Sequence, residues 1–439
     1  MDLVGRLDRF FHLTERSTDV RTEFKGALLI FLSMSYIIVV NPLMMSSAGM
    51  DVSATFTATV LMTIVGCLVM GLYANFPVAQ APAMGINAFF VYTVVIVMGY
   101  QWDAALAAVV ISGALFLLVS ISGIRKRVLD SIPVGLRHGI VVGIGCFITM
   151  VGLINAGIIV GGSGTLVSLG DLSDTRVILG LFSIGLTVFL YARRVQGAIL
   201  IGMMVTILLA IVLGATEVPD SIFAVPSMPD FGAFLGGFGP EILDIRFLMV
   251  VVSFAFVEFF DGSGTLMAVG KRAGIADGGG NVILDRAMNA DAACASLSGM
   301  VGCTPTSAYA ESAVGIEAGS RTGLTAVFVA MFFAVSLLIV PILQMVDIVC
   351  TAGAMFMVGV AMITELRGVD WDDVPLIAAI LLTILMMLLT YSITNGITFG
   401  IIIYCVSMIG ARRGSELNPV MYAMAGISVL YFVMNVVYL

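Results

Sequence analysis

Residues 77–90 read PVAQAPAMGINAFF, and residues 302–315 read GCTPTSAYAESAVG. Each stretch is an extended segment containing a proline, Pro82 or Pro305, that runs into a helix too short to cross a bilayer alone. Inside a membrane, the backbone leaves helical form only where it is buried in protein or lines a watery cavity. A matched pair of such breaks, one in each half of a chain, is typical of the substrate site of a secondary transporter with inverted repeats.

The composition restricts the class of protein. Of the 439 residues, 60% are hydrophobic and 11% are charged, and the mean hydropathy is +1.12. A soluble domain carries about 25% charged residues. Apolar runs near membrane-spanning length recur from Phe24 to Leu439, which indicates an all-α polytopic membrane protein. The scattered cysteines form no CxxC pair, and the two histidines lie at expected helix ends. We therefore predict no metal site, no cofactor and no nucleic-acid partner.

Fourteen spans are predicted, seven in each half of the chain. They centre near Ile37, Met62, Phe89, Ala114, Gly145, Gly185 and Thr206, and near Phe256, Ala292, Ala310, Met331, Phe356, Ile384 and Ile403. Because seven is odd, the second repeat is inverted relative to the first. The expected division is a first repeat over 1–215, an extracellular or periplasmic linker over 216–244, a second repeat over 245–413 and a C-terminal apolar segment over 414–439. Residues 420–439 either span the bilayer or lie in its interface.

The distribution of Lys and Arg predicts how these spans are oriented in the membrane. All 20 Lys and Arg residues except Arg176 and Arg246 fall on the side of the N-terminus. The positive-inside rule then predicts a multi-pass protein of the inner or plasma membrane with both termini cytoplasmic. The opposite face collects acidic residues, namely Asp51, Asp103, Asp171, Asp174, Glu217, Asp220, Asp230, Glu241 and Asp244.

Four carboxylates lie within predicted spans, where ionisable groups are costly and usually face a cavity or a partner. Glu258 and Asp261 are three residues apart and share one helix face. Because two close carboxylates cannot both ionise cheaply in a low dielectric, the pair is expected to bind and release a proton. The following residues 262–265, Gly-Ser-Gly-Thr, are expected to loosen the helix. The alternative is a structural role as a buried pair or a capped helix break.

Asp291 and Glu311 are the other two carboxylates. Asp291 has an equally weighted structural interpretation, a polar cluster with Arg286 and Asn289. Glu311 follows the break at Pro305 and Thr306, early in the second half-helix.

The first half-helix offers an amide at the comparable place, since Asn87 follows the break at Pro82 and Gly85. Its alternative role is a helix cap. Both half-helix N-termini would point free N–H groups toward the middle of the membrane. With Phe89 and Tyr309, which are more often packing residues, this site suits a flat, neutral, hydrogen-bonding ligand. An anion transporter would need a basic residue at depth, and an intramembrane enzyme would need a nucleophile–base pair or metal ligands; the predicted spans offer neither.

At these residues the chain resembles the AzgA-like purine permeases, the adenine, guanine and hypoxanthine branch of the nucleobase–cation symporter superfamily. The resemblance covers nearly the whole chain. It rests on Phe11–Arg16, Phe31–Pro42, Ala81–Phe90, Asp261–Leu266, Thr304–Thr306, Tyr309, Glu311–Ala313 and Arg321–Thr325. The chain departs from the family pattern at Ala83 and Glu258, which leaves the preferred purine open.

The resemblance implies a core domain, made of the first four spans of each repeat, and a gate domain, made of the last three. Such proteins are often dimeric, so a second copy of the chain is an expected partner. It also implies proton-coupled purine uptake and no enzymatic activity, with a uracil or xanthine permease of the same fold as the alternative. The residues expected to bind substrate are Glu258, Glu311, Asn87, Phe89 and Tyr309, and those expected to couple protons are Asp261, Glu258 and Asp291.

Overall fold

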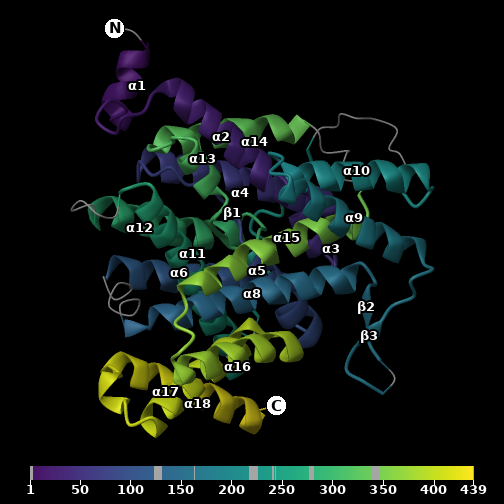
Figure 1. Ribbon diagram of the computed structural model, residues 1–439, viewed down its shortest axis with the longest axis vertical. Helices are drawn as coiled ribbons and strands as arrows, with labels where there is room; N and C mark the ends of the chain where they lie inside the picture. Colours follow the sequence, from purple (N-terminus) through teal and green to yellow (C-terminus); the bar gives the residue numbers. More distant parts are fainter. Residues whose placement is uncertain are drawn as a thin grey trace.

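The computed structural model describes residues 3–122, 131–162, 164–216, 226–239, 242, 244–275, 281–338 and 346–438. Most of its helices run from one side of the molecule to the other, with their ends gathered at two opposite faces (Figure 1). Thirteen of the fourteen predicted span centres lie inside a described helix, and the fourteenth, Ala310, lies in the turn between β4 and α13.

The first half of the chain contains ten helices and three short strands among the described residues. They are α1 (Leu3–Phe11), α2 (Val20–Met34), α3 (Ile37–Ser46), α4 (Val52–Leu72), β1 (Gln80–Pro82), α5 (Met84–Ala88), the π-helix η1 (Phe89–Val97), α6 (Trp102–Ile121), α8 (Val134–Asn155), β2 (Ile159–Val160), β3 (Ser168–Leu169), α9 (Thr175–Ala192) and α10 (Ala198–Val212). The β2–β3 hairpin was not predicted from the sequence.

The second half repeats this order of long helices around a broken segment. Its described elements are the short η2 (Ala233–Leu235), α11 (Ile245–Arg272), α12 (Asn281–Met300), β4 (Thr306–Ala308), α13 (Ser312–Glu317), α14 (Gly323–Ser336), η5 (Ile348–Thr351), α15 (Ala352–Ile363), η6 (Thr364–Gly368), α16 (Val374–Thr390), α17 (Ile393–Gly410), η7 (Gly414–Glu416) and α18 (Pro419–Tyr438).

Several helices begin at a side-chain cap. The carboxylates of Asp51, Asp174 and Asp244 accept hydrogen bonds from backbone N–H groups in the first turns of α4, α9 and α11. Such caps satisfy donors that the helix itself leaves free. Three acidic residues of the predicted outer face therefore mark the points where the chain enters helices.

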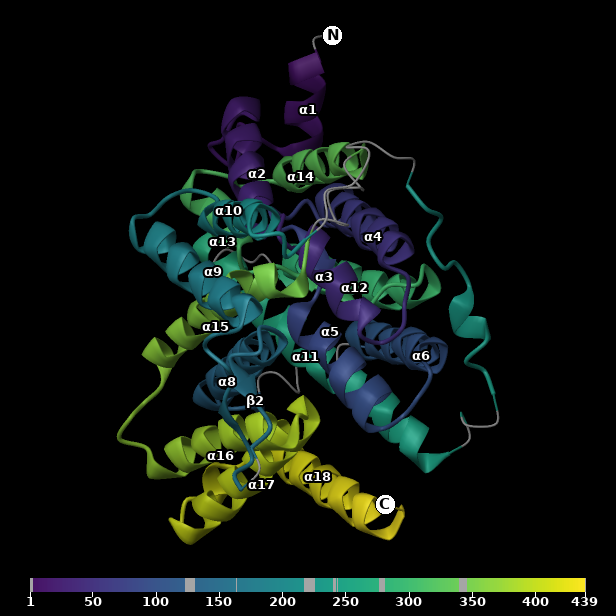
Figure 2. The same ribbon diagram turned by 90° about the vertical axis from the view of Figure 1, so that its right-hand side faces the viewer.

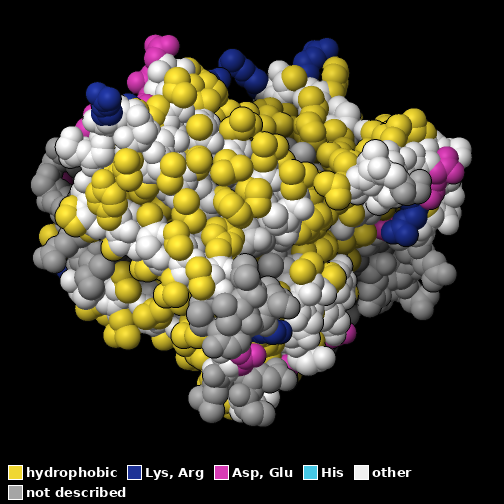
Figure 3. Space-filling view, turned by 90° about the horizontal axis from the view of Figure 1, so that it is seen from below, with side chains coloured by type: hydrophobic (Ala, Val, Ile, Leu, Met, Phe, Trp, Pro, Cys, Tyr) yellow, Lys and Arg dark blue, Asp and Glu magenta, His cyan; other side chains and the backbone are white. Residues whose placement is uncertain are grey.

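The outer surface fits a lipid environment. Seven described segments are long and apolar enough to cross a bilayer, namely Val20–Ser46, Val52–Leu72, Trp102–Ile121, Val134–Asn155, Thr175–Ala192, Ile348–Gly368 and Ile393–Gly410. Figure 3 shows one face covered mainly by hydrophobic side chains, with few charged ones. Large apolar side chains such as Phe189, Leu208 and Leu389 are exposed. The chain is thus a multi-pass membrane protein, and its number of spans stays a prediction.

The helices pack in two groups. Helices α2, α4 and α6 pack mainly with α11 to α14, and helices α8 to α10 pack mainly with α15 to α17, while the short helix α5 contacts both α8 and α11. In Figure 2, α8, α9 and α15 lie to the left of α4, α6 and α12. The division into a core domain and a gate domain stays a prediction. Within the second group, Gly135, Gly139 and Gly143 lie one turn apart on α8, and a Cβ at any of them would overlap a side chain of α16.

The structure bears on the predictions for α11 and for the C-terminal apolar segment. Helix α11 runs unbroken through residues 262–265, so the prediction of a loosened helix there was wrong. A Cβ on Gly262 would overlap the Asp291 carboxylate, which shows that this glycine provides room for a close approach. The C-terminal apolar stretch forms α18, which packs against α17 through the rings of Phe399 and Phe432, 4.3 Å apart.

Candidate functional site

The two broken segments meet in the first helix group as an antiparallel pair of strands. Strand β1 pairs with β4 in the register Gln80 with Ala308, Ala81 with Ser307 and Pro82 with Thr306. Two further backbone bonds extend the pair, from Ala83 N to the Pro305 carbonyl and from Tyr309 N to the Ala79 carbonyl, each 3.0 Å. Every residue of both strands is buried. The pairing satisfies backbone groups that could not remain free inside a membrane.

Asp291 on α12 fastens this pair of strands. Its Oδ1 accepts one hydrogen bond from Gln80 Nε2 in β1 and one from Ala308 N in β4, each 3.1 Å. The Asp291 side chain is 2% exposed. A single carboxylate oxygen therefore bridges two residues that face each other across the strand pair, and these contacts differ from the predicted cluster with Arg286 and Asn289. The geometry favours a positioning role for Asp291.

Glu311 stands where β4 turns into α13. It is the residue preceding the first turn of α13, yet its side chain makes no capping hydrogen bond to that helix. The carboxylate instead accepts a hydrogen bond from the Tyr36 hydroxyl, with 2.8 Å between Tyr36 Oη and Glu311 Oε1. The next side chain, Ser312, accepts a hydrogen bond of 3.0 Å from Ala79 N and ties α13 to the first broken segment. Glu311 is thus held close to the strand pair, and its carboxylate oxygens can accept further hydrogen bonds.

Asn87 lies in the other half-helix, α5, and is fully buried. Neither its Oδ1 nor its Nδ2 has a hydrogen-bond partner within the described part of the chain. Since Asn87 is inside α5, its side chain does not cap the helix, and the alternative interpretation as a cap was wrong. A buried amide with no partner is costly and calls for an explanation such as a bound ligand or water.

Glu258 and Asp261 lie on α11, close to the strand pair. Glu258 is 2% exposed, and its Oε1 accepts a hydrogen bond of 3.2 Å from Ser112 Oγ on α6. Asp261 is adjacent to Gly262, where an added Cβ would overlap the Asp291 carboxylate and lie 3.0 Å from Ser307 Oγ on β4, and it lies within electrostatic range of Asp291 and Glu311. Three of the four predicted intramembrane carboxylates therefore gather around β4.

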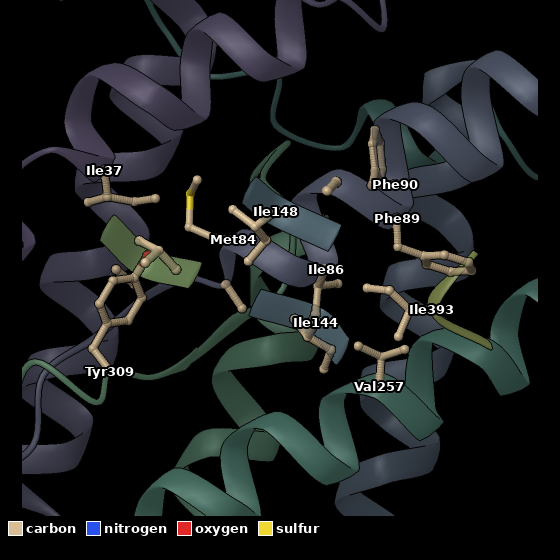
Figure 4. Packing of buried hydrophobic residues seen from close by; sticks show 14 of the residues in the cluster. Ile37, Met84, Ile86, Phe89, Phe90, Ile144, Ile148, Val257, Tyr309 and Ile393 are labelled. Carbon is tan, nitrogen blue, oxygen red and sulfur yellow. The ribbon is translucent and has the colours of Figure 1, made fainter. Parts of the chain in front are cut away.

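The predicted aromatic residues have packing roles in this structure. Tyr309 is buried, and its hydroxyl donates a 2.7 Å hydrogen bond to the Pro82 carbonyl, which adds a further bond between the broken segments. Phe89 is buried against Phe254, with ring centroids 4.9 Å apart. Figure 4 shows Tyr309 and Phe89 at opposite ends of the α5 region, with Ile86 and Ile144 between them.

A small cavity of about 30 Å³ lies beside Phe89 and is lined also by Thr93, Ser253 and Ser392. It has room for about one water molecule.

Sequence reasoning missed three polar residues of this region. Tyr36 holds Glu311, Gln80 binds Asp291, and Glu23 is fully buried at the start of α2. The Glu23 carboxylate accepts hydrogen bonds from the backbone N–H groups of Arg321 and Thr322 and from the Thr325 hydroxyl, and so holds the N-terminus of α14. Gln80 carried a usable signal, because a polar residue within a span needs a partner.

The fold and the buried carboxylates around two half-helices define a membrane permease. The sequence model described as "Permease family" matches residues 21–399. The chain belongs to this family, which confirms the resemblance drawn from the sequence motifs.

Two relatives match along nearly their whole length. The guanine/hypoxanthine permease PbuG of Bacillus subtilis is 38% identical over 435 residues, which cover 97% of this chain and 99% of PbuG. The adenine permease AdeP of Escherichia coli is 38% identical over 436 residues, which cover 99% of this chain and 97% of AdeP.

The fold is also similar to that of a solved structure, the transmembrane domain of a cyanobacterium bicarbonate transporter BicA. The TM-score is 0.64 at 16% identity, and the match covers 87% of this chain and 96% of that domain. At this identity the similarity concerns the fold alone.

Proposed function

We propose that this protein imports purine nucleobases, namely hypoxanthine, guanine and adenine, by proton symport with alternating access. The observation that carries the proposal is the arrangement at the strand pair, where Glu311 begins one half-helix and the Asn87 amide, without a partner among the described residues, lies in the other. The names of the full-length relatives support a purine as the substrate.

The chemistry of the site matches that of a purine. A purine presents ring and exocyclic N–H groups, which a carboxylate accepts, and ring nitrogens and carbonyl oxygens, which an amide N–H can bind. Glu311 and Asn87 supply these two functions, and Glu258 supplies a further acceptor. An anionic substrate would be repelled by the carboxylates Glu258, Asp261 and Glu311, in spite of the fold shared with a bicarbonate transporter.

Proton coupling rests on Asp261. A neutral substrate accumulates against a gradient only if a cation moves with it. Asp261 lies within range of two other carboxylates, so protonation relieves repulsion between them. The helix group that carries the site would then move relative to the group of α8 to α10 and α15 to α17. Uptake is therefore expected to rise as the external pH falls.

An uptake competition assay tests the substrate. Cells that lack their own purine permeases would express the full chain and take up labelled hypoxanthine, with unlabelled adenine, guanine, xanthine and uracil as competitors. Competition by guanine and adenine, with little effect of uracil, is the expected result. Strongest competition by uracil or xanthine would favour the alternative, a uracil or xanthine permease. Cells carrying an empty vector provide the background.

A further inference from the structure

A second hollow lies beside the N-terminal helix. It has a volume of about 290 Å³ and lies between α1, the end of α4 and the start of α12. We call it the α1 groove. Its lining residues are Phe10, His12, Arg16, Leu72, Tyr73, Ala74, Asn75, Ile283 and Arg286. Figure 1 shows α1 at one extremity of the molecule, beyond α2.

The α1 groove is basic. Three basic side chains from two distant parts of the chain line it, and none of its lining residues is acidic. Arg16 donates from one guanidinium nitrogen, Nη1, to the backbone carbonyls of Asn75 at 2.9 Å and Arg321 at 3.0 Å. These partners are neutral, so the positive charge of Arg16 is not cancelled by direct contact.

Two carboxylates that do not line the groove, Glu15 and Glu23, interact electrostatically with Arg16. Glu15 lies 3.4 Å from His12 Nδ1, and its side chain is 78% exposed. Glu23 is engaged with the N-terminus of α14 through the N–H groups of Arg321 and Thr322. A bound anion would therefore face the guanidinium groups of Arg16 and Arg286 without an acidic side chain in the groove itself.

The rim of the groove is apolar and exposed. Phe10, Leu72 and Tyr73 are 55%, 49% and 53% exposed, respectively. On the other side of α1, Phe11 is buried and packs in a cluster with Leu13 and Leu324. Helix α1 thus presents apolar side chains both to the protein and outward, as helices that lie in the membrane interface do.

We propose that the α1 groove binds the phosphate headgroup of an anionic membrane lipid. Planar guanidinium groups bind phosphate oxygens through paired hydrogen bonds. The face that carries the N-terminus is the one that the distribution of Lys and Arg predicts to be cytoplasmic, where basic hollows beside spans bind anionic headgroups. The exposed apolar rim favours a lipid over free phosphate, because acyl chains would cover Phe10 and Leu72. The volume, about ten times that of a water molecule, accommodates a phosphate with its glycerol.

Lipid binding by the purified, detergent-solubilised full chain tests this proposal. The ligands are phosphatidylglycerol, phosphatidylcholine, glycerol 3-phosphate and inorganic phosphate, and the readouts are retained lipid by native mass spectrometry and the shift in melting temperature. Phosphatidylglycerol is expected to bind and to raise the melting temperature more than phosphatidylcholine. Equal binding of both lipids would overturn the proposal. So would binding of free phosphate that matches and displaces phosphatidylglycerol.

Three variants locate the site. Arg286→Gln is expected to weaken phosphatidylglycerol binding about fivefold, the effect of one basic residue near a membrane surface. Arg367→Gln removes an exposed charge from the same predicted face, in η6, which packs against α8 and does not line the groove, and is expected to leave binding unchanged. Phe10→Ser should weaken lipid binding without creating affinity for glycerol 3-phosphate. Unchanged binding in Arg286→Gln, or an equal loss in Arg367→Gln, would contradict the assignment.

Discussion

The two broken segments share a backbone arrangement but differ in chemistry. Each passes from a short strand into a short helix, and the strands pair with each other. In the first, the short helix α5 carries the Asn87 amide and continues into the mainly apolar π-helix over Phe89–Val97. The second begins at a carboxylate, Glu311, which Tyr36 holds in place. The comparison indicates that the strand pairing maintains the architecture, while the polar groups differ between the two half-helices; under the proposed function, the two half-helices would contribute unequally to purine recognition.

The largest effect is expected at Glu311. Glu311→Gln keeps the shape of the side chain but replaces one acceptor edge with donors. Losing a charge-assisted pair costs about 1.5–3 kcal/mol, which is about a ten- to hundredfold loss of purine affinity. Competition for labelled hypoxanthine uptake measures it, with membrane abundance as the control. Unchanged affinity in a well-expressed variant would remove Glu311 from the site.

Substitution of Asp261 tests whether the proton gradient drives purine accumulation. A membrane potential of 100 mV supports about 2.3 kcal/mol per proton charge, or about fiftyfold accumulation. Asp261→Asn is expected to reduce accumulation toward equilibrium while exchange of labelled for unlabelled purine continues. Wild-type uptake should collapse with a protonophore and need no sodium. Accumulation that survives the protonophore but requires sodium would contradict proton coupling.

Tyr36 provides a test of coupling within the second broken segment. Tyr36→Phe removes one hydrogen bond to Glu311 and is expected to weaken purine affinity about two- to tenfold, the effect of about 0.5–1.5 kcal/mol. Since Tyr36 acts through Glu311, the double variant with Glu311→Gln should lose little more than Glu311→Gln alone. Additive losses would show that Tyr36 acts independently of the carboxylate.

The smallest change in affinity, and the clearest change in selectivity, is expected at Asn87. Asn87→Thr alters the hydrogen-bonding groups of the first half-helix and should change which purines compete for uptake. Because the amide has no partner among the described residues, its loss should not lower the melting temperature of the ligand-free protein. A fall in the melting temperature with an unchanged competition pattern would assign Asn87 a structural role.

The sequence predicted the backbone of the site better than its contacts. Proline and short apolar helices located both breaks, and their burial follows from the rule that unpaired backbone is excluded from lipid. The pairing itself was not predicted, because Gln80 and Ala308 are far apart in the sequence and three-residue strands carry no periodic signal. The hydrogen bond from Tyr36 to Glu311 was also not predicted, because an aromatic residue in a span is usually interpreted as a packing residue.

Asp291 and Gly262 show why residue type alone was insufficient. Asp291 reads equally as a proton-coupling carboxylate and as part of a polar cluster with Arg286 and Asn289, yet its contacts join the two strands. Gly262 reads as a flexible point, yet it lies in a continuous helix and makes room for Asp291. In both cases the decisive information was a neighbour that is distant in the chain.

The pairing of β1 with β4 also affects how the protein is made. Ribosomes add about 5–20 residues per second, so residues 306–308 follow residues 80–82 into the membrane after about 10–45 seconds. During this interval the backbone of β1 lacks its final partner in a medium that offers no replacement. The first half of the nascent chain therefore depends on the insertion machinery, or on temporary contacts with its own helices, until the second half arrives to complete it.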